Sequence, residues 1–335
     1  MSTSPEPNPQ INRPAASPVT EPIVRLADPW EVRTFGDAMR AEATGTPWTI
    51  QDLLPDETVT LVAAQPHAMK SLSWLEASLE AVTYHSVWTE FKAPDVERAL
   101  FVETEDPPWL VEARIRGFAK GLNIHPRDEV PGFHYACTGP FDLLRERSKL
   151  RRLLEKVQPD FAVLSTLQNL LAGKSWQKPE DMQPVYAVVL ELARSCCPIV
   201  LITHSPWDKR QKRAAGTVTQ VANCVTTLHY EKILNRKTGE TFAHVLLDSK
   251  AGAMHDDFHF KLTTEGDGAD PESVRDITYE GRGWPKGIAK DAVMAALEDD
   301  PNASPKEIAE RCNVSVRYVE RIIKEWKSGR KQAAR

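Results

Sequence analysis

The amino-acid sequence predicts an α/β fold with a mostly parallel central sheet, followed by a small all-α domain. Two observations lead to this prediction. Between residues 58 and 205, short apolar runs typical of buried strands alternate with segments of helical periodicity. Beyond residue 286 the pattern is helical throughout. Strands that alternate with helices pair in parallel and are covered by helices on both faces.

The strands are predicted from apolar runs, and the helices from apolar residues spaced three or four positions apart. In the first helix, for example, Leu72, Leu75, Leu79 and Val82 share one face. The parallel strands are expected at residues 58–64, 99–106, 134–139, 160–167 and 198–205. The helices between them are expected at 71–84, 107–122, 141–158 and 183–196. Three antiparallel strands, at 224–233, 241–250 and 258–265, are expected to close the sheet.

Changes in composition divide the chain into four parts. Residues 1–29 are rich in Pro and Ser and predict a disordered leader. Residues 30–263 would form the α/β core, and the Gly-, Asp- and Pro-containing stretch 264–285 a linker. Residues 286–335 would form the helical domain.

Composition restricts the class of protein. The net charge is −5, the charged content is 27%, and no apolar run is long enough to span a bilayer. Five cysteines, an odd number without a CxxC pair or a secretion signal, indicate reduced thiols in the cytoplasm. No residue pattern is typical of a metal site. From Val316 to the C-terminus, seven basic side chains stand against two acidic ones, which indicates an anionic partner.

The stretch "TVTLVAAQPHAMKSLSWLEASLEAV", residues 58–82, has the outline of a phosphate-binding loop. A strand leads through a short turn to Lys70 and Ser71, which begin a helix. At such a helix N-terminus, unpaired amides and the helix dipole attract phosphate, the Lys reaches the terminal phosphates, and the Ser binds Mg²⁺. The alternative is that Lys70 and Ser71 only begin a helix.

Several segments in order then resemble one family. The segments "WTIQDLLPDETVTLVAAQPHAMKS", "ALFVETEDPPWLVEARIRGF", "PDFAVLSTLQNL" and "PIVLITHS" are similar to the RepA-like hexameric ATPases of the RecA superfamily, which have a P-loop NTPase fold. The resemblance covers about residues 48–262, and "TEDPP" is its most particular block. It implies ATP and Mg²⁺ as cofactors, Glu105 as the catalytic carboxylate and His204 as a γ-phosphate sensor. The alternative for Glu105 is that it caps the following helix.

Four positions depart from the family pattern. Ala64 and Met69 stand where the loop has glycines, and a Cβ is costly in the backbone conformation before the Lys. Ser165 replaces the aspartate that holds the magnesium shell. Ala215 replaces the arginine that subunits donate to one another, a loss of about 10³–10⁵ in rate. Because these are separate parts of one machinery, we expect no useful ATP hydrolysis and no enzymatic activity.

The segment "ASPKEIAERCNVSVRYVERIIKEWK" matches a helix-turn-helix. Ser304, Pro305 and Glu307 form a helix start, and the turn falls at Asn313. Residues near the start of the second helix read base edges, and later basic residues reach phosphates. The DNA-binding residues are expected to be Ser315, Arg317, Tyr318, Arg321, Lys324 and Lys327. A protein-docking helical domain of the same shape is the alternative.

These observations favour a DNA-binding protein on a degenerate ATPase core. The core would form a homo-oligomer, a hexamer by the resemblance, and present helix-turn-helix modules to double-stranded DNA, as in a replication or regulatory factor of a plasmid, phage or other mobile element. One alternative is an active ATP-dependent DNA helicase or loader with an unusual phosphate loop. Another is a non-enzymatic adaptor that docks on a protein partner in a nucleic-acid complex.

Overall fold

The computed structural model describes most of the chain after the N-terminal leader. The described residues are 34–40, 45–125, 130–176, 178–204, 218–234, 240–251, 254–265, 270–282, 288–312, 314 and 316–333. The leader, Ser315, Asn313 and Ala215 therefore lie outside the described residues. A short helix, α1 (Phe35–Arg40), belongs to a separate unit formed by residues 1–44.

A nine-stranded sheet organises the described part of the core, in the order β13-β12-β11-β10-β3-β9-β8-β6-β7. The six strands from β10 to β7 pair in parallel, and β10 to β13 pair antiparallel. The parallel strands are β3 (Val59–Ala64), β6 (Ala99–Glu103), β7 (Phe133–Cys137), β8 (Phe161–Ser165), β9 (Ile199–His204) and β10 (Thr226–Leu234). The antiparallel ones are β11 (Thr241–Ser249), β12 (Met254–Thr264) and β13 (Val274–Arg282). The predicted mostly parallel sheet is confirmed. The strand expected at 224–233 as part of the antiparallel set differs: β10 pairs with β3 in parallel and with β11 antiparallel, so it joins the two halves of the sheet.

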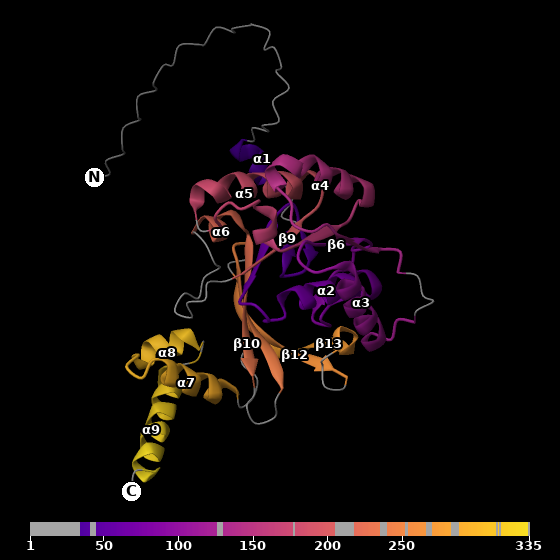
Figure 1. The fold of residues 1–335 in the computed structure, drawn as a ribbon. Helices are drawn as coiled ribbons and strands as arrows, with labels where there is room; N and C mark the ends of the chain where they lie inside the picture. Colours follow the sequence, from indigo (N-terminus) through magenta and orange to yellow (C-terminus); the bar gives the residue numbers. More distant parts are fainter. Residues whose placement is uncertain are drawn as a thin grey trace, which may run out of the picture. The chain divides into compact units, whose positions relative to one another are not determined.

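Helices cover both faces of the parallel half, as Figure 1 shows. On one face α2 (Lys70–Tyr84) and α3 (Pro108–Gly121) pack over a core that includes Trp74 and Phe118. On the other face α4 (Leu143–Val157) and α5 (Pro179–Ser195) pack over a second core. Both cores share β3, whose side chains alternate: Val62 and Ala64 face the first, while Leu61 and Ala63 face the second.

Smaller elements complete the core. Two hairpins pair β1 (Trp48–Ile50) with β2 (Leu54–Pro55) and β4 (Ser86–Val87) with β5 (Phe91–Lys92). Single helical turns are η1 (Leu167–Leu170) and η2 (Pro271–Ser273), and α6 (Val218–Asn223) precedes β10. Among the described helices, none combines the length and apolarity needed to cross a bilayer.

The predicted linker at 264–285 is wrong for much of its length. Its residues 271–282 form η2 and β13, and β13 pairs with β12 as an edge strand of the sheet. The Gly- and Asp-rich residues 266–269, between β12 and η2, lie outside the described part of the chain. The strand escaped prediction because its two buried apolar residues, Val274 and Ile277, are three positions apart and do not show the period of two that is typical of a strand.

The C-terminal domain contains α7 (Ile288–Asp299), α8 (Pro305–Arg311) and α9 (Val316–Ala333). A separate apolar cluster joins them, and Val293, Leu297, Ile308 and Val319 are among its buried members. The predicted start of α8 is confirmed as a reciprocal capping box. The Glu307 amide donates to Ser304 Oγ at 3.2 Å, and the Ser304 amide donates to Glu307 Oε2 at 2.7 Å.

Candidate nucleotide edge and helix-turn-helix surface

The predicted phosphate loop lies at the carboxyl end of β3 and leads directly into α2. Met69 immediately precedes the helix with φ 64° and ψ 3°, in the left-handed region that favours glycine, and His67 has φ 62°. The Met69 side chain is buried in the core between sheet and helix. The turn thus has the positive-φ backbone that a phosphate loop needs, although methionine occupies the position.

The N-terminus of α2 is open to an anion. No side chain caps it, and its first turn contains no acidic residue. Its exposed amides and positive dipole end are the physical basis of phosphate binding at helix starts. Lys70 opens the helix, so a cation stands beside these amides.

Carboxylates surround the buried Lys70 ammonium group, whose side chain is only slightly exposed. Burial lowers the pKa of Lys70, while the negative charges of Glu105, Glu103 and Asp106 oppose that shift. His204, at the end of β9, also faces this charge: burial and the Lys70 cation lower the pKa of His204 to about 4. The structure therefore brings the predicted residues Lys70, Glu105 and His204 into one electrostatic environment.

The hydroxyl groups of Ser71 and Ser165 face each other across the end of the sheet. Their Oγ atoms are 3.2 Å apart, and Ser165 is buried at the end of β8. The structure thus places Ser165 directly beside the hydroxyl predicted to bind Mg²⁺. At the position where the resemblance implies a carboxylate, a neutral hydroxyl is present.

Glu103 is a residue of this edge that the sequence analysis missed. It ends β6, pairs in register with Ser165 and is 2% exposed. Its Oε1 accepts the amides of Thr104, Glu105 and Asp106 at 2.9, 2.8 and 3.3 Å. Burial raises the pKa of Glu103, and these amides act against the shift. One carboxylate therefore holds the turn that carries Glu105.

The capping alternative for Glu105 receives no support. The residue before α3 is Pro107, and no side chain makes a capping hydrogen bond there. Asp106 instead pairs with Arg114, one turn and a half into α3. Glu105 is free of a helix-capping role, which agrees with a position facing Lys70.

Polar residues after β8 extend the site. Gln168 Nε2 donates to Thr203 Oγ1 at 3.0 Å, and Asn169 Nδ2 donates to the Thr104 carbonyl oxygen at 3.1 Å. Two buried polar atoms, Gln168 Oε1 and His204 Nδ1, have no hydrogen-bond partner among the described residues. Buried polar atoms are normally paired, so these are suited to contact a ligand. The polar run "STLQN" directly after a buried strand was the available signal.

The phosphate parts of ATP·Mg²⁺ therefore fit this edge, and the magnesium part does not. Lys70, the open start of α2 and the positive-φ turn would hold phosphates. The Ser71 hydroxyl would be a magnesium ligand, but the opposite residue, Ser165, supplies no charge. Ala215, which stands where the family has the arginine donated between subunits, lies outside the described residues.

Helix α9, the second helix of the helix-turn-helix, presents a basic surface. Arg317, Arg321 and Lys324 are exposed, and their spacing places them on one face of α9. The Arg321 guanidinium lies 4.9 Å from the centre of the Tyr318 ring, a cation–π contact that orients it. The backbone of α9 includes Lys327, but its side chain lies outside the described residues.

Comparison with known families agrees with both parts. Residues 23–210 match the AAA domain family. The chain belongs to this family. Residues 292–334 match the homeodomain-like domain, which places a second known fold at the C-terminus.

Among solved structures, one match is to part of this chain only. The crystal structure of a KaiC-like protein from the archaeon Pyrococcus horikoshii OT3 is 11% identical, with a TM-score of 0.47, and the match covers 70% of this chain and 94% of that one. A comparison with curated protein sequences finds no match.

The AAA-domain match covers the edge of the sheet where Lys70, Ser71, Glu105 and His204 lie, and the predicted mostly parallel α/β core followed by a helix-turn-helix domain is confirmed. The roles of individual residues stay predictions. For Lys70, Ser71, Glu105 and His204, the structure brings the side chains to one edge of the sheet. For the helix-turn-helix, it shows Arg317, Tyr318, Arg321 and Lys324 on α9.

Proposed function

We propose that this protein binds double-stranded DNA through its helix-turn-helix, and that its AAA domain no longer hydrolyses ATP efficiently. The observation that carries the proposal is the 3.2 Å contact between Ser71 Oγ and Ser165 Oγ. At this position a phosphoryl-transfer site needs a carboxylate to hold the magnesium shell, because the metal neutralises charge that develops on the phosphates.

Phosphate binding itself is supported by the geometry that remains. The Lys70 cation and the uncapped start of α2 lie at this edge, together with His204 Nδ1, which has no hydrogen-bond partner among the described residues. Substituting an arginine finger or a magnesium ligand reduces turnover more than it reduces phosphate binding, since those groups act on the transition state. We therefore expect the AAA domain to act as a nucleotide-binding scaffold.

DNA binding is supported by the charge on α9. Its exposed Arg317, Arg321 and Lys324 lie on one face of α9, the second helix of the helix-turn-helix within a homeodomain-like domain. In this arrangement the second helix enters the major groove, and basic side chains contact phosphates. The overall charge of −5 makes this local basic surface the favoured site for DNA.

Oligomerisation completes the proposal. The resemblance to RepA-like ATPases implies a hexamer, and several helix-turn-helix modules on one particle would raise affinity through effective concentration. A role in the replication or regulation of a plasmid, phage or other mobile element follows from the same resemblance.

An active ATPase is the second candidate, and specific residues favour it. Glu105, Glu103 and Asp106 lie close enough to Lys70 to act on its charge, and Met69 keeps the backbone conformation of a functional loop. In that case one of the β6 carboxylates would take over the charge that Ser165 lacks.

The deciding experiment is steady-state ATP turnover by the purified full chain, with Mg²⁺ and with or without duplex DNA. Lys70→Ala is the matched control, because it removes the cation of the site. We expect the wild-type rate to equal that of the control, and duplex binding to be the same for both proteins. A wild-type rate well above the control would establish the active ATPase instead.

A gain-of-function variant sharpens this test. Ser165→Asp restores a carboxylate next to Ser71, and Ser165→Asn has the same size without the charge. We expect only the Asp variant to gain turnover over wild type. If both variants stay at the control rate, the missing carboxylate alone does not explain the loss.

A further inference from the structure

Helix α9 has one face that is buried in its own domain. Val319 and Ile322 are 0% and 1% exposed, and Tyr318 and Ile323 pack against the same apolar cluster. Helices α7 and α8 supply most of the other members of that cluster, and Figure 1 shows them beside the beginning of α9. The opposite face of α9 is therefore the one that this helix-turn-helix presents to a ligand.

A carboxylate lies in the middle of that exposed face. Arg317 comes three residues before Glu320, and Lys324 comes four residues after it, so the three side chains are neighbours on the helix surface. All three are exposed, and so is Arg321. The DNA contacts that the sequence predicts include no acidic residue, so Glu320 is an addition to that surface.

The contacts of Glu320 give it no structural role. Its side chain forms no ion pair or hydrogen bond with another residue in the described part of the chain. Other carboxylates of this domain do have such contacts: Glu307 caps α8, and Asp299 pairs with Arg311. On a basic face that meets DNA, a carboxylate repels phosphates and so weakens binding, unless it makes a specific contact of its own.

The major groove of DNA offers a carboxylate one well-suited partner. Each base presents its own pattern of donors and acceptors there, and a glutamate accepts a hydrogen bond from the N4 amino group of cytosine. Guanine and thymine present acceptors without a donor, and adenine has its N7 acceptor beside its N6 amino group. Because an acceptor repels the carboxylate oxygens, cytosine is the base that a glutamate favours.

We propose that Glu320 selects a cytosine in the major groove and so gives the helix-turn-helix its specificity at that base pair. This inference rests on the proposed function and adds sequence selectivity to it. Arg317, Arg321 and Lys324 attract the duplex whatever its sequence. Glu320 opposes this attraction wherever no cytosine amino group meets it, and it thereby lowers the affinity for other sequences.

The test is a selection from a duplex library with a randomised centre, performed with the purified full chain. We expect wild type to enrich a motif in which one position is cytosine. Glu320→Gln should keep the other positions and exchange this C·G pair for A·T, because glutamine pairs with the N6 and N7 atoms of adenine. Glu320→Ala should lose selectivity at this position alone.

Affinities for fixed duplexes give the size of the effect. One duplex carries the enriched motif, and a second has thymine in place of the selected cytosine. Wild type should prefer the first by about tenfold, whereas Glu320→Ala should bind both about equally. Glu320→Ala should also bind a mixed-sequence duplex without the motif more tightly than wild type does, because a negative charge that faces the phosphates is gone.

The matched control is Glu298→Gln. It removes the same charge at an exposed residue of α7, a helix of this domain that precedes the helix-turn-helix. The control should keep the wild-type motif and the wild-type affinities. Circular dichroism of all three variants checks that the helices are intact.

Each outcome decides the matter. A motif that both Glu320 variants leave unchanged would overturn the inference, and so would a Glu320-dependent position that prefers a base other than cytosine in wild type. Equal weakening of every position would show that Glu320 supports the helix and contacts no base, and an equal change in the Glu298 control would show an effect of net charge alone. If wild type binds duplexes without enriching a motif, selection by Glu320 is refuted and the proposed DNA binding stands. Absence of duplex binding would refute the proposed function itself.

Discussion

Met69 occupies a backbone conformation that ordinarily belongs to glycine. At φ 64° a residue with a Cβ costs about 1 kcal/mol or more, and the buried Met side chain offsets this by packing in the core. The residue therefore keeps the shape of the loop without its usual glycine. Its side chain turns into the core and not towards the phosphate side.

Two substitutions at Met69 separate these effects. Met69→Ala loses the buried side chain and keeps the Cβ, whereas Met69→Gly loses both. We expect the Gly variant to be more stable than the Ala variant by about 1 kcal/mol, because only Gly relieves the positive φ. Urea denaturation measures the difference. An Ala variant at least as stable as the Gly variant would contradict the left-handed conformation.

The buried Glu76 and Glu80 on α2 and the half-buried Asp276 on β13 form an acidic cluster. Burial is the main cause that raises the pKa of Glu80 to about 7, and burial together with the negative Glu80 raises the pKa of Glu76 well above its usual range. Glu80 Oε2 accepts the Trp88 amide at 2.6 Å, and Asp276 accepts from Thr278. Both glutamates therefore hold a proton more tightly in the folded protein than in the unfolded chain.

This cluster predicts a fold that loses stability as the pH rises. The folded-state pKa of Glu80, about 7, lies above its ordinary value of 4.5, so the folded protein holds the proton more tightly. The contribution is complete below pH 4.5 and disappears as the pH rises through about 7. We expect the urea midpoint to fall between about pH 5 and pH 8, and Glu80→Gln to flatten this dependence. Glu155→Gln, at an exposed position on α4, should leave it unchanged; a flattened curve in that control would refute the assignment.

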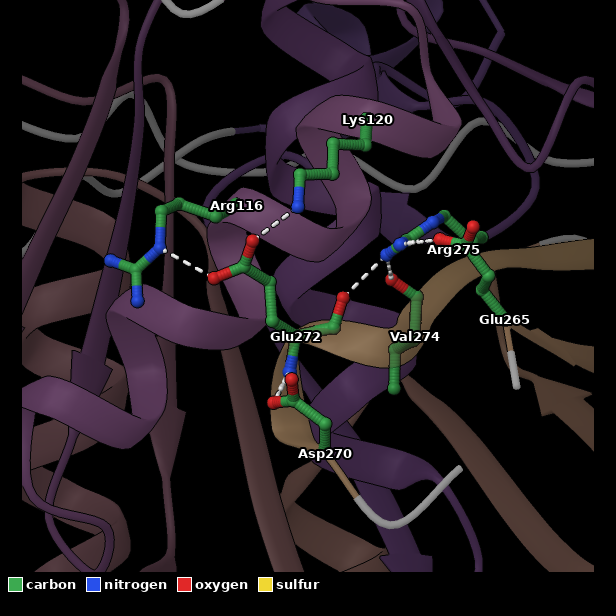
Figure 2. A network of polar contacts seen from close by, with 7 residues as sticks. All are labelled: Arg116, Lys120, Glu265, Asp270, Glu272, Val274 and Arg275. Atoms are coloured by element: carbon green, nitrogen blue, oxygen red, sulfur yellow. Dashed lines mark hydrogen bonds and ion pairs between the residues drawn. The ribbon is translucent and has the colours of Figure 1, made fainter. Parts of the chain in front are cut away.

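At the scale of elements, α3 owes its place to two glycines. Alanine in a helix interior normally stabilises by about 0.5–1 kcal/mol relative to glycine. At Gly117, in the interior of α3, the added Cβ would meet the Val274 carbonyl oxygen at 2.4 Å, so packing reverses that preference; at Gly121, the last residue of α3, the added Cβ would meet the Arg275 carbonyl oxygen at 1.7 Å. The sequence shows only that α3 contains glycines. The structure shows why: β13 lies so close to α3 that a side chain at these positions would collide with its backbone, in the interface that Figure 2 shows.

We expect Gly121→Ala to destabilise the protein by about 1–3 kcal/mol, the usual range for overpacking. Thermal or urea denaturation measures it. Gly139→Ala is the control, because nothing lies within 4 Å of an added Cβ there and only the positive φ of 66° is strained. A Gly121→Ala protein as stable as wild type would show that α3 and β13 do not lie this close.

The basic face of α9 predicts how the affinity for DNA depends on salt concentration. Arg321→Ala should weaken binding to a duplex and reduce the slope of log affinity against log salt, because one phosphate contact is lost. The control is Arg145→Ala, at a side chain that is 87% exposed on α4 of the core. Salt titrations of both variants decide the prediction. An unchanged slope for Arg321→Ala would place the DNA contact elsewhere.

At the scale of the whole molecule, the two domains differ in the size of their buried apolar clusters. The core buries two apolar clusters on opposite sides of one sheet, whereas the helix-turn-helix has a single small cluster. A domain of this small size binds DNA with modest affinity, and several copies on one particle would compensate for it.

We therefore expect the protein to assemble in solution, with six subunits as the resemblance to RepA-like ATPases implies. Sedimentation velocity over a range of protein concentrations, with and without ATP, measures the subunit number. The same duplex should dissociate more slowly from the assembled particle than from dilute monomer. A monomer at every concentration would refute the multivalent part of the proposal.

The sequence by itself determined the alternation of strands and helices, the start of α2 at Lys70 and the capping box at Ser304. These features depend on residues close together in the chain, and local periodicity and capping chemistry report them. It also identified Ser165 as a departure, because the resemblance gives the residue expected there.

Only the tertiary structure decided which distant residues meet. Ser71 contacts Ser165, Glu103 holds the turn before α3, and Glu76 satisfies an amide of β13. The tertiary structure also shows that much of the predicted linker is the edge strand β13, which contacts both α2 and α3. The physical reason is that this edge strand, which has few apolar residues, is stabilised by its hydrogen bonds to β12 and by the helices packed on it. These contacts come from distant parts of the chain, so they produce no periodic pattern in the strand's own sequence.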